Sequence, residues 1–383
     1  MTEVDRVIFI EPFPFASRLH VLGPLAQGAA ATAKSEVLIP GRETGVDWDE
    51  FIEAIPSDVS VIRQPGLTVR RESGVPPRTA LAIVKEALKR TNDRSAIVLT
   101  AIDDYPKDLW RIAFRLAFRK ERKLFIRYRV DDFRAVSPRR GPRQWAKRIY
   151  FGLCTLVARA ETVVFDERIR SGRRVHVVPD PWTGPFGFLN KSSSREALGW
   201  PGTDRVVTIV GNQDPRKGFS AACEILALAR QQDPELRAVL VGKVPEIHAS
   251  ELAELSGRFG SAFTHVARYV TDNELALLMS GSDAILMPYT SSFTSTSGVL
   301  VRAAASNTPV ISTGHGLVGW RVTNHHLGAT FAEGKHADAA SLILKACTGG
   351  LDSEGRVFAD ASTAESLSKA FASVLTNRHN VHA

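Results

Sequence analysis

Two short segments of the chain combine cations, hydroxyls and glycines in a way that suits a bound phosphate. In residues 206–219, an apolar run is followed by Asn212 and then by Arg216, Lys217 and Gly218. Such a run predicts a strand, a loop and a helix start, where a phosphate would meet positive charge and backbone donors. An ordinary solvated loop with a basic pair is the alternative interpretation.

The second segment covers residues 284–305, where an apolar run leads through a hydroxyl-rich loop into a predicted helix. Ser295, Thr296, Ser297 and Gly298 stand directly at the expected helix start. Serine and threonine cap helix amides, and a glycine lets a phosphate approach the backbone closely. The alternative is a capped core helix with a polar lead-in.

Carboxylates follow two apolar runs in the first half of the chain. Asp103 and Asp104 follow one run, and Asp131 and Asp132 follow the next. A carboxylate near a reacting hydroxyl could accept its proton or stabilise a cationic carbon. Asp103, Asp104 and Asp131 are therefore candidate catalytic residues, and aspartates in turns or helix caps are the alternative.

The elements that must position these residues are short β-branched runs alternating with stretches of helical spacing. Several runs are apolar on both faces, as expected of parallel strands covered by helices on each side. The alternation predicts an α/β fold with doubly wound parallel sheets. The runs predicted as strands are residues 7–10, 37–39, 59–62, 96–99, 124–126, 162–165, 175–178, 206–210, 238–241, 263–266, 284–287 and 310–311.

The length of 383 residues indicates two domains, since a typical domain has ~150 residues. A proline-rich connector at residues 179–185 suits the boundary. We expect two Rossmann-like domains, residues 1–180 and 181–383, facing a central cleft. We also expect the last helix, about residues 363–376, to pack back on the first domain. Ligands in such sheets bind beyond the carboxyl ends of the strands.

Composition favours an anionic partner and excludes several classes of protein. The chain has 49 basic and 41 acidic residues, a net charge of +8. Its three cysteines form no CxxC pair, so no zinc ribbon or disulfide framework is expected. A signal peptide and runs of ~20 apolar residues are lacking, which predicts a cytoplasmic protein, soluble or peripheral on the inner face of the membrane. An NAD-dependent Rossmann protein is excluded, because no GxGxxG follows the first strand.

Residues 206–331 resemble the carboxyl-terminal domain of GT-B nucleotide-sugar glycosyltransferases, and most of all the retaining glycosyltransferase family four. The resemblance rests on the order and spacing of GNQDPRKGF, LVGK, YVTDNEL, SDAILMPY, SGVLVRAAASNTPVI and GHG. The amino-terminal half resembles that family only in its strand–helix rhythm. The resemblance implies a GT-B fold and a hexosyltransferase-like enzyme. Such an enzyme moves a sugar from a nucleotide-diphosphate donor to a hydroxyl acceptor.

The resemblance also implies how the donor is held. Lys217 falls on the lysine that contacts the diphosphate, Asn212 stands where the family usually has arginine, and the helix start at Ser297 and Gly298 holds the distal phosphate. Base selection usually depends on the backbone near Tyr269. The residues expected to bind the donor are Asn212, Arg216, Lys217, Tyr269, Ser295, Thr296, Ser297, Gly298 and Arg302.

The chain departs from the family at two glutamate positions, which hold Thr294 and Arg302. Arg302 has only donors, so it could donate to ribose oxygens or pair with a phosphate. Two alternatives to a retaining enzyme stay open: a catalytically silent relative serving as a binding or scaffold subunit, and an inverting GT-B enzyme. No metal is expected, and no cofactor beyond the donor itself, such as a UDP- or GDP-sugar.

Basic residues four positions apart mark one predicted helix in the first half. Arg111, Arg115 and Arg119 form a stripe, flanked by aromatic residues such as Trp110 and Phe114. This composition suits a helix lying on an anionic bilayer, as a lipid-linked or polysaccharide glycan acceptor would require. A packed Rossmann helix with a solvated basic edge is the alternative. Nucleic acid is not an expected partner, because the aromatic spacing is that of a helix and not of an RNA-binding sheet.

Overall fold

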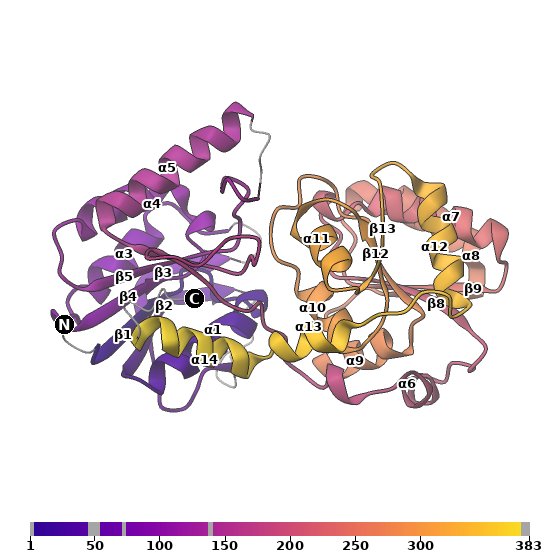
Figure 1. Cartoon of the computed structure of the whole chain (residues 1–383), viewed down its shortest axis with the longest axis horizontal. Helices are drawn as coiled ribbons and strands as arrows, with labels where there is room; N and C mark the ends of the chain where they lie inside the picture. Colours follow the sequence, from indigo (N-terminus) through magenta and orange to yellow (C-terminus); the bar gives the residue numbers. More distant parts are fainter. Residues whose placement is uncertain (1–3, 45–53, 71–73, 137–140, 377–383) are drawn as a thin grey trace. The chain divides into compact units, whose positions relative to one another are not determined.

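The computed structural model describes residues 4–44, 54–70, 74–136 and 141–376, which form two compact units (Figure 1). Unit 1 comprises the residues up to Pro181 together with those from Thr363 onward, and unit 2 comprises Trp182–Ser362. Each unit is built on a parallel sheet with helices on both faces. This arrangement confirms the α/β class predicted from the alternating pattern.

The sheet of unit 1 has seven parallel strands in the order β3-β2-β1-β4-β5-β6-β7. Each apolar run predicted as a strand in this half overlaps one of them. The strands are β1 (Arg6–Ile10), β2 (Lys34–Thr44), β3 (Ser60–Arg70), β4 (Ser95–Leu99), β5 (Arg122–Arg127), β6 (Glu161–Val164) and β7 (Val175–Val177).

Helices cover both faces of this sheet because successive residues of each strand point to opposite sides. Val7 and Phe9 of β1 belong to the core beneath α1 and α14, whereas Ile8 and Ile10 belong to the core beneath α3, α4 and α5. The helices of unit 1 are α1 (Ala16–Ala30), α3 (Thr79–Ala87), α4 (Pro106–Leu116), α5 (Pro142–Ala158) and α14 (Ala364–Thr376).

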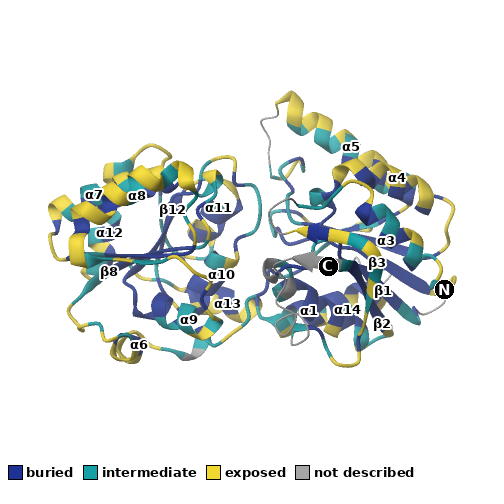
Figure 2. Ribbon diagram, turned by 180° about the vertical axis from the view of Figure 1, so that it is seen from behind, coloured by how far each residue is buried: buried dark blue, intermediate teal, exposed yellow. Residues whose placement is uncertain are grey.

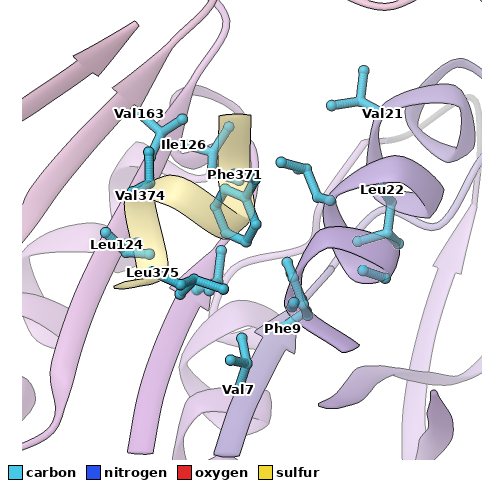
Figure 3. Close-up of a cluster of buried hydrophobic side chains, with 14 of the residues drawn as sticks. Val7, Phe9, Val21, Leu22, Leu124, Ile126, Val163, Phe371, Val374 and Leu375 are labelled. Carbon is cyan, nitrogen blue, oxygen red and sulfur yellow. The ribbon is translucent and has the colours of Figure 1, made fainter. Parts of the chain in front are cut away.

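Helix α14 completes the core of unit 1, although it follows the whole of unit 2 in the chain. Phe371 is fully buried, and its ring centroid lies 5.9 Å from that of Phe9 (Figure 3). Gly28 of α1 permits this packing, because a Cβ there would lie 2.2 Å from the carbonyl oxygen of Ser368. Unit 1 is therefore discontinuous in sequence.

The sheet of unit 2 has six parallel strands in the order β10-β9-β8-β11-β12-β13. Five of them confirm predicted runs, whereas β13 was not predicted. The strands are β8 (Arg205–Val210), β9 (Leu236–Val241), β10 (Phe263–Val266), β11 (Ala284–Met287), β12 (Val310–Thr313) and β13 (Gly328–Phe331).

The helices of unit 2 pack on both faces of this sheet. They are α6 (Lys191–Leu198), α7 (Phe219–Gln232), α8 (Ala249–Phe259), α9 (Asp272–Gly281), α10 (Gly298–Ala305), α11 (Gly316–Asn324), α12 (His336–Cys347) and α13 (Gly355–Ala361). None of the helices described in either unit combines the length and apolar character that a bilayer span requires.

Each sheet has a point at which the chain reverses the direction of strand addition. In unit 1 this switch lies between β1 and β4, and in unit 2 it lies between β8 and β11. The loops leaving the two strands diverge there, which opens a crevice at their carboxyl ends. We therefore expect substrates to bind at one or both of these switch points.

Candidate functional site

The switch point of unit 2 is formed by the loop after β8 and the loop after β11, which are fastened together. The amide of Thr290 donates to the carbonyl oxygen of Arg216 at 2.9 Å. Gly218 adopts a φ of 69°, and a Cβ there would lie only 2.0 Å from the carbonyl oxygen of Pro288. A glycine is therefore required where the two loops meet.

Lys217 lies at the centre of this junction. Its Nζ donates to the carbonyl oxygen of Val210 at 3.3 Å and is 5.7 Å from the ring centroid of Tyr289. Gly211 leaves room for the ammonium group, because a Cβ there would lie 2.2 Å from Nζ. Lys217 makes no ion pair with any residue that the structure describes, so its charge can be offered to an anion.

The first turn of α10 lies beside Lys217. Ser297 caps this helix, its Oγ accepting from the amide of Leu300 at 3.4 Å. The hydroxyl of Tyr289 is 3.5 Å from the same Oγ, so Tyr289 contacts both Ser297 and Lys217. The first amides of a helix lack intrahelical acceptors and carry partial positive charge, which suits this terminus to an anion. Gly298, the first helical residue, is exposed.

Arg302 folds back along α10 towards that first turn. Its Nη1 donates to the carbonyl oxygen of Gly298 at 3.3 Å, and its guanidinium carbon is 5.5 Å from the ring centroid of Phe186. Its Nη2 lies 3.7 Å from Asp272 Oδ1. Burial raises the pKa of the Asp272 carboxyl, and the charge of Arg302 opposes that shift. Arg302 thus adds positive charge to the helix terminus, partly offset by Asp272.

Two further predicted donor residues make contacts around the loop after β8. Arg216 is ion-paired with Asp214 at 3.0 Å, and Asn212 Oδ1 accepts from the amide of Lys243 at 3.1 Å. The side chain of Lys243 is exposed at the end of β9. Sequence reasoning did not select Lys243 as a site residue, although the LVGK segment contains it. The signal was a cation directly after a predicted strand.

The other predicted donor residues lie at increasing distance from Lys217. Ser295 and Thr296 are half-buried immediately before the cap residue of α10. Tyr269 follows β10, which is two strands from β8, and Tyr269 is 59% exposed. The structure therefore gathers the Lys217 and Ser297 segments closely and places Tyr269 near the outer end of the same sheet edge.

The three predicted catalytic aspartates lie near the carboxyl ends of β4 and β5 in unit 1, and each is ion-paired. Asp103 accepts from Arg127 Nε at 3.1 Å and from the amides of Tyr128 and Arg129 at 2.9 and 3.2 Å.

The other two pairs are less enclosed. Asp104 pairs with Arg18 and, at 3.1 Å, with Arg129, and Asp131 pairs with Lys147 at 2.9 Å. The side chains of Asp104 and Asp131 are 18% and 14% exposed, against 5% for Asp103. A catalytic role for these residues stays a prediction.

Glu11, which sequence reasoning missed as a site residue, lies directly after β1 at the switch point of unit 1. It is 1% exposed, and its Oε1 accepts from the amide of Phe13 at 2.8 Å. Burial raises the pKa of its carboxyl to about 7, and the nearby charge of Arg18 opposes the shift. The signal in the sequence was an acid interrupting an apolar run at its carboxyl end.

Replacing Glu11 with glutamine is expected to flatten the pH dependence of stability. The pKa of Glu11 rises from 4.5 to about 7 on folding, so the folded state binds more protons between these values. Stability therefore falls as pH rises through this window, by about 3 kcal/mol in all. Urea unfolding across this range should show that slope in the parent and not in the variant. Parallel slopes in the two proteins would contradict the assignment.

Among residues 4–44, 54–70, 74–136 and 141–376, no group of three or more His, Cys, Asp or Glu side chains is placed to hold a metal ion. Whether the reaction needs a metal stays a prediction.

The sequence of unit 2 identifies its domain type. Residues 204–348 match the family model for glycosyl transferases group 1. Unit 2 contains a group 1 glycosyltransferase domain. The matched residues include Lys217, the cap residue Ser297 and the loops that join them. A search of curated proteins finds no match.

Solved structures with the same architecture include a glycosyltransferase. WaaG, a glycosyltransferase involved in lipopolysaccharide biosynthesis, has a TM-score of 0.67 at 17% identity, covering 97% of this chain and 100% of that one. Sucrose-phosphate synthase from Thermosynechococcus elongatus has a TM-score of 0.64 at 17% identity, covering 97% and 95%. HepE from Anabaena, in complex with UDP and glucose, has a TM-score of 0.61 at 16% identity, covering 97% and 95%. The group 1 glycosyltransferase domain thus belongs to a chain with the predicted GT-B fold.

Proposed function

We propose that the protein transfers a sugar from a nucleotide-diphosphate donor to a hydroxyl acceptor, with the diphosphate bound at the switch point of unit 2. The observation that carries this proposal is the position of Lys217, a cation without a described ion pair, beside the capped terminus of α10. The group 1 domain supports nucleotide-sugar glycosyl transfer in general. HepE, which shares the fold, has been crystallised with UDP and glucose.

In this mechanism the residues of unit 2 act on the leaving group. As the bond between the sugar and the diphosphate breaks, negative charge grows on the phosphate oxygens. Lys217 and the amides at Ser297 and Gly298 stabilise that charge from fixed positions, and Arg302 adds to the potential at the helix terminus. These groups serve the role that a metal ion has in other transferases.

In unit 1, we propose that a carboxylate receives the proton of the acceptor hydroxyl. Asp104 and Asp131 are the stronger of the predicted candidates, because their side chains are 18% and 14% exposed, against 5% for Asp103.

The finer features of the proposal follow partly from the family resemblance, which implies retention, and partly from the residues themselves. They are retention at the sugar carbon, independence from metal, and a glycan or lipid-linked acceptor used in polysaccharide biosynthesis at the cytoplasmic face of the membrane. The involvement of WaaG in lipopolysaccharide biosynthesis supports an acceptor of this kind.

A catalytically silent binding or scaffold subunit is the second candidate function. Thr294 and Arg302 favour it, because they occupy the positions of the two family glutamates. Arg302 is moreover largely buried against Gly298 and Asp272.

The test is a screen of nucleotide diphosphates and sugar nucleotides for thermal stabilisation. A ligand at 100 times its Kd adds ~2.7 kcal/mol to the stability of the folded state, so the correct nucleotide raises the melting temperature by several degrees. Release of UDP or GDP from the stabilising sugar nucleotide then separates an enzyme from a silent relative. The anomeric configuration of the product separates retention from inversion. If no nucleotide diphosphate stabilises the protein, the donor site is refuted.

A further inference from the structure

Helix α5 exposes a continuous apolar stripe. Trp145, Ile149, Leu153 and Leu156 are 39–60% exposed and are separated by four, four and three residues, which places them on one side of the helix. The helix is drawn largely in the colours of exposed and intermediate residues (Figure 2). Apolar side chains gathered in this way mark an interaction surface. The family resemblance did not extend to this segment.

A cavity of about 610 Å³ lies beside this helix within unit 1. Its walls include Arg127, Arg134, Arg148 and Arg174, with Asp132 the one acid among them, and apolar side chains such as Phe151. A shallower groove of about 320 Å³ contains the apolar stripe and shares Arg134 and Arg148 with the cavity. We call the larger space, defined by its four arginines, the arginine cavity.

The arginine cavity has a surplus of positive charge. Arg127 is neutralised, because its guanidinium binds Asp132 at 2.7 Å and Asp103 at 3.1 Å. Arg134, Arg148 and Arg174 make no ion pair with the part of the chain that the structure describes. The sequence of α5 contains no acidic residue, and Asp108, the one acid of the adjacent α4, is buried. Carboxylates of these helices therefore do not offset the attraction for an anion.

Gly152 keeps the opening free. It lines both the cavity and the groove, and a Cβ at this position would meet no atom within 4 Å. Glycine inside a helix costs roughly 0.5–1 kcal/mol relative to alanine. No close backbone contact requires a glycine at this position. We therefore attribute the glycine to the open space that its missing side chain leaves between the groove and the cavity.

We propose that α5 docks on an anionic phospholipid bilayer, with a lipid phosphate group in the arginine cavity and Trp145, Ile149 and Leu153 among the acyl chains. An amphiphile with a phosphate beside hydrocarbon matches this pairing of unpaired arginines and an apolar stripe. A free phosphate or a nucleic acid would leave the stripe in water. This inference rests on the membrane location proposed above and adds the side chains that recognise the lipid.

Helix α4 also exposes aromatic and basic side chains. Trp110, Phe114 and Phe118, just beyond the helix, are 45–86% exposed at spacings of four residues, and Arg111 and Arg115 are exposed between them. The two helices are neighbours, since the hydroxyl of Tyr150 donates to the carbonyl oxygen of Pro106. Of the basic stripe predicted from the sequence, Arg111 and Arg115 lie on α4, whereas Arg119 lies beyond the end of the helix and pairs with Glu121 at 2.5 Å.

The experiment is co-sedimentation of the full chain with vesicles at low salt. One set contains phosphatidylcholine alone, and the other adds an equal amount of phosphatidylglycerol. We expect binding to the anionic vesicles only, weakened about 25-fold by the double variant Arg134→Gln/Arg148→Gln, since each basic residue near the surface contributes about fivefold. Gly152→Gln should weaken vesicle binding without changing the charge, and Trp145→Ser should weaken it as well. The control is Lys345→Gln, at an exposed position of α12, which should leave vesicle binding unchanged.

Several results would overturn the inference. The first is equal binding to neutral and anionic vesicles, and the second is an unchanged vesicle affinity in the double variant. The third is that soluble glycerol phosphate displaces the parent and the Trp145→Ser variant from the vesicles equally well. Loss of RNA binding in the double variant without loss of vesicle binding would indicate nucleic acid instead. UDP and GDP binding is measured on the same preparations. Intact nucleotide binding with absent vesicle binding would reject the lipid site and leave the donor site standing.

Discussion

Replacing Lys217 with alanine is expected to weaken the binding of UDP or GDP by roughly 10- to 150-fold. The substitution removes a charge-assisted hydrogen bond to the diphosphate, which contributes about 1.5–3 kcal/mol. Lys217 has no described carboxylate partner that would lose its cation in the variant. The loss should therefore appear in ligand binding and not in the stability of the fold. Isothermal titration calorimetry measures both affinities directly.

The matched control is Lys345→Ala. Lys345 is an exposed lysine in the last turn of α12, and this helix runs away from the carboxyl ends of the strands. It should bind nucleotide like the parent. Equal affinities for the parent and Lys217→Ala would place the diphosphate elsewhere.

Replacing Arg127 with methionine is expected to destabilise unit 1 by about 3–5 kcal/mol. The side chain of Arg127 is 5% exposed and binds two buried carboxylates, Asp103 at 3.1 Å and Asp132 at 2.7 Å. Methionine would leave both carboxylates buried without a cation, which is the costly way to break a buried ion pair. Urea unfolding at neutral pH measures the loss.

Arg129→Met is the control for this substitution. Arg129 pairs with Asp104 at 3.1 Å, but its side chain is 40% exposed, and such pairs contribute ~1 kcal/mol or less. If the two variants unfold at the same urea concentration, the network around Arg127 contributes little, and Asp103 becomes more credible as a catalytic group.

The strands could be predicted because burial on both faces requires unbroken runs of β-branched residues. The exception is β13, whose sequence Gly-Ala-Thr-Phe lacks a run of β-branched residues and begins with Gly328 at a φ of 143°. Helix α5 was not predicted either, because its exposed apolar stripe blurs the usual contrast between a buried and a solvated face.

The grouping of Lys217 and Ser297 was predictable from the sequence, whereas the contacts of the neighbouring predicted residues were not. Lys217 and Ser297 each follow a strand, and parallel strands bring their carboxyl ends to one edge of the sheet. The tie between Asn212 and Lys243 depends on neighbours 31 residues apart, and the return of Arg302 to Gly298 depends on its rotamer. Asp103 was predicted as a catalytic candidate because it follows an apolar run, and its pairing with Arg127, 24 residues away in sequence, could not be predicted.

The discontinuity of unit 1 has a consequence for biosynthesis. A ribosome delivers β1, with Val7 and Phe9, long before it delivers the helix that contains Phe371. When the whole of unit 2 has been synthesised, the apolar face of unit 1 that this helix covers is still exposed to solvent. Exposed surface of this kind makes partly made proteins prone to aggregate. We therefore expect chaperones to hold the emerging amino-terminal lobe until translation has passed residue 376.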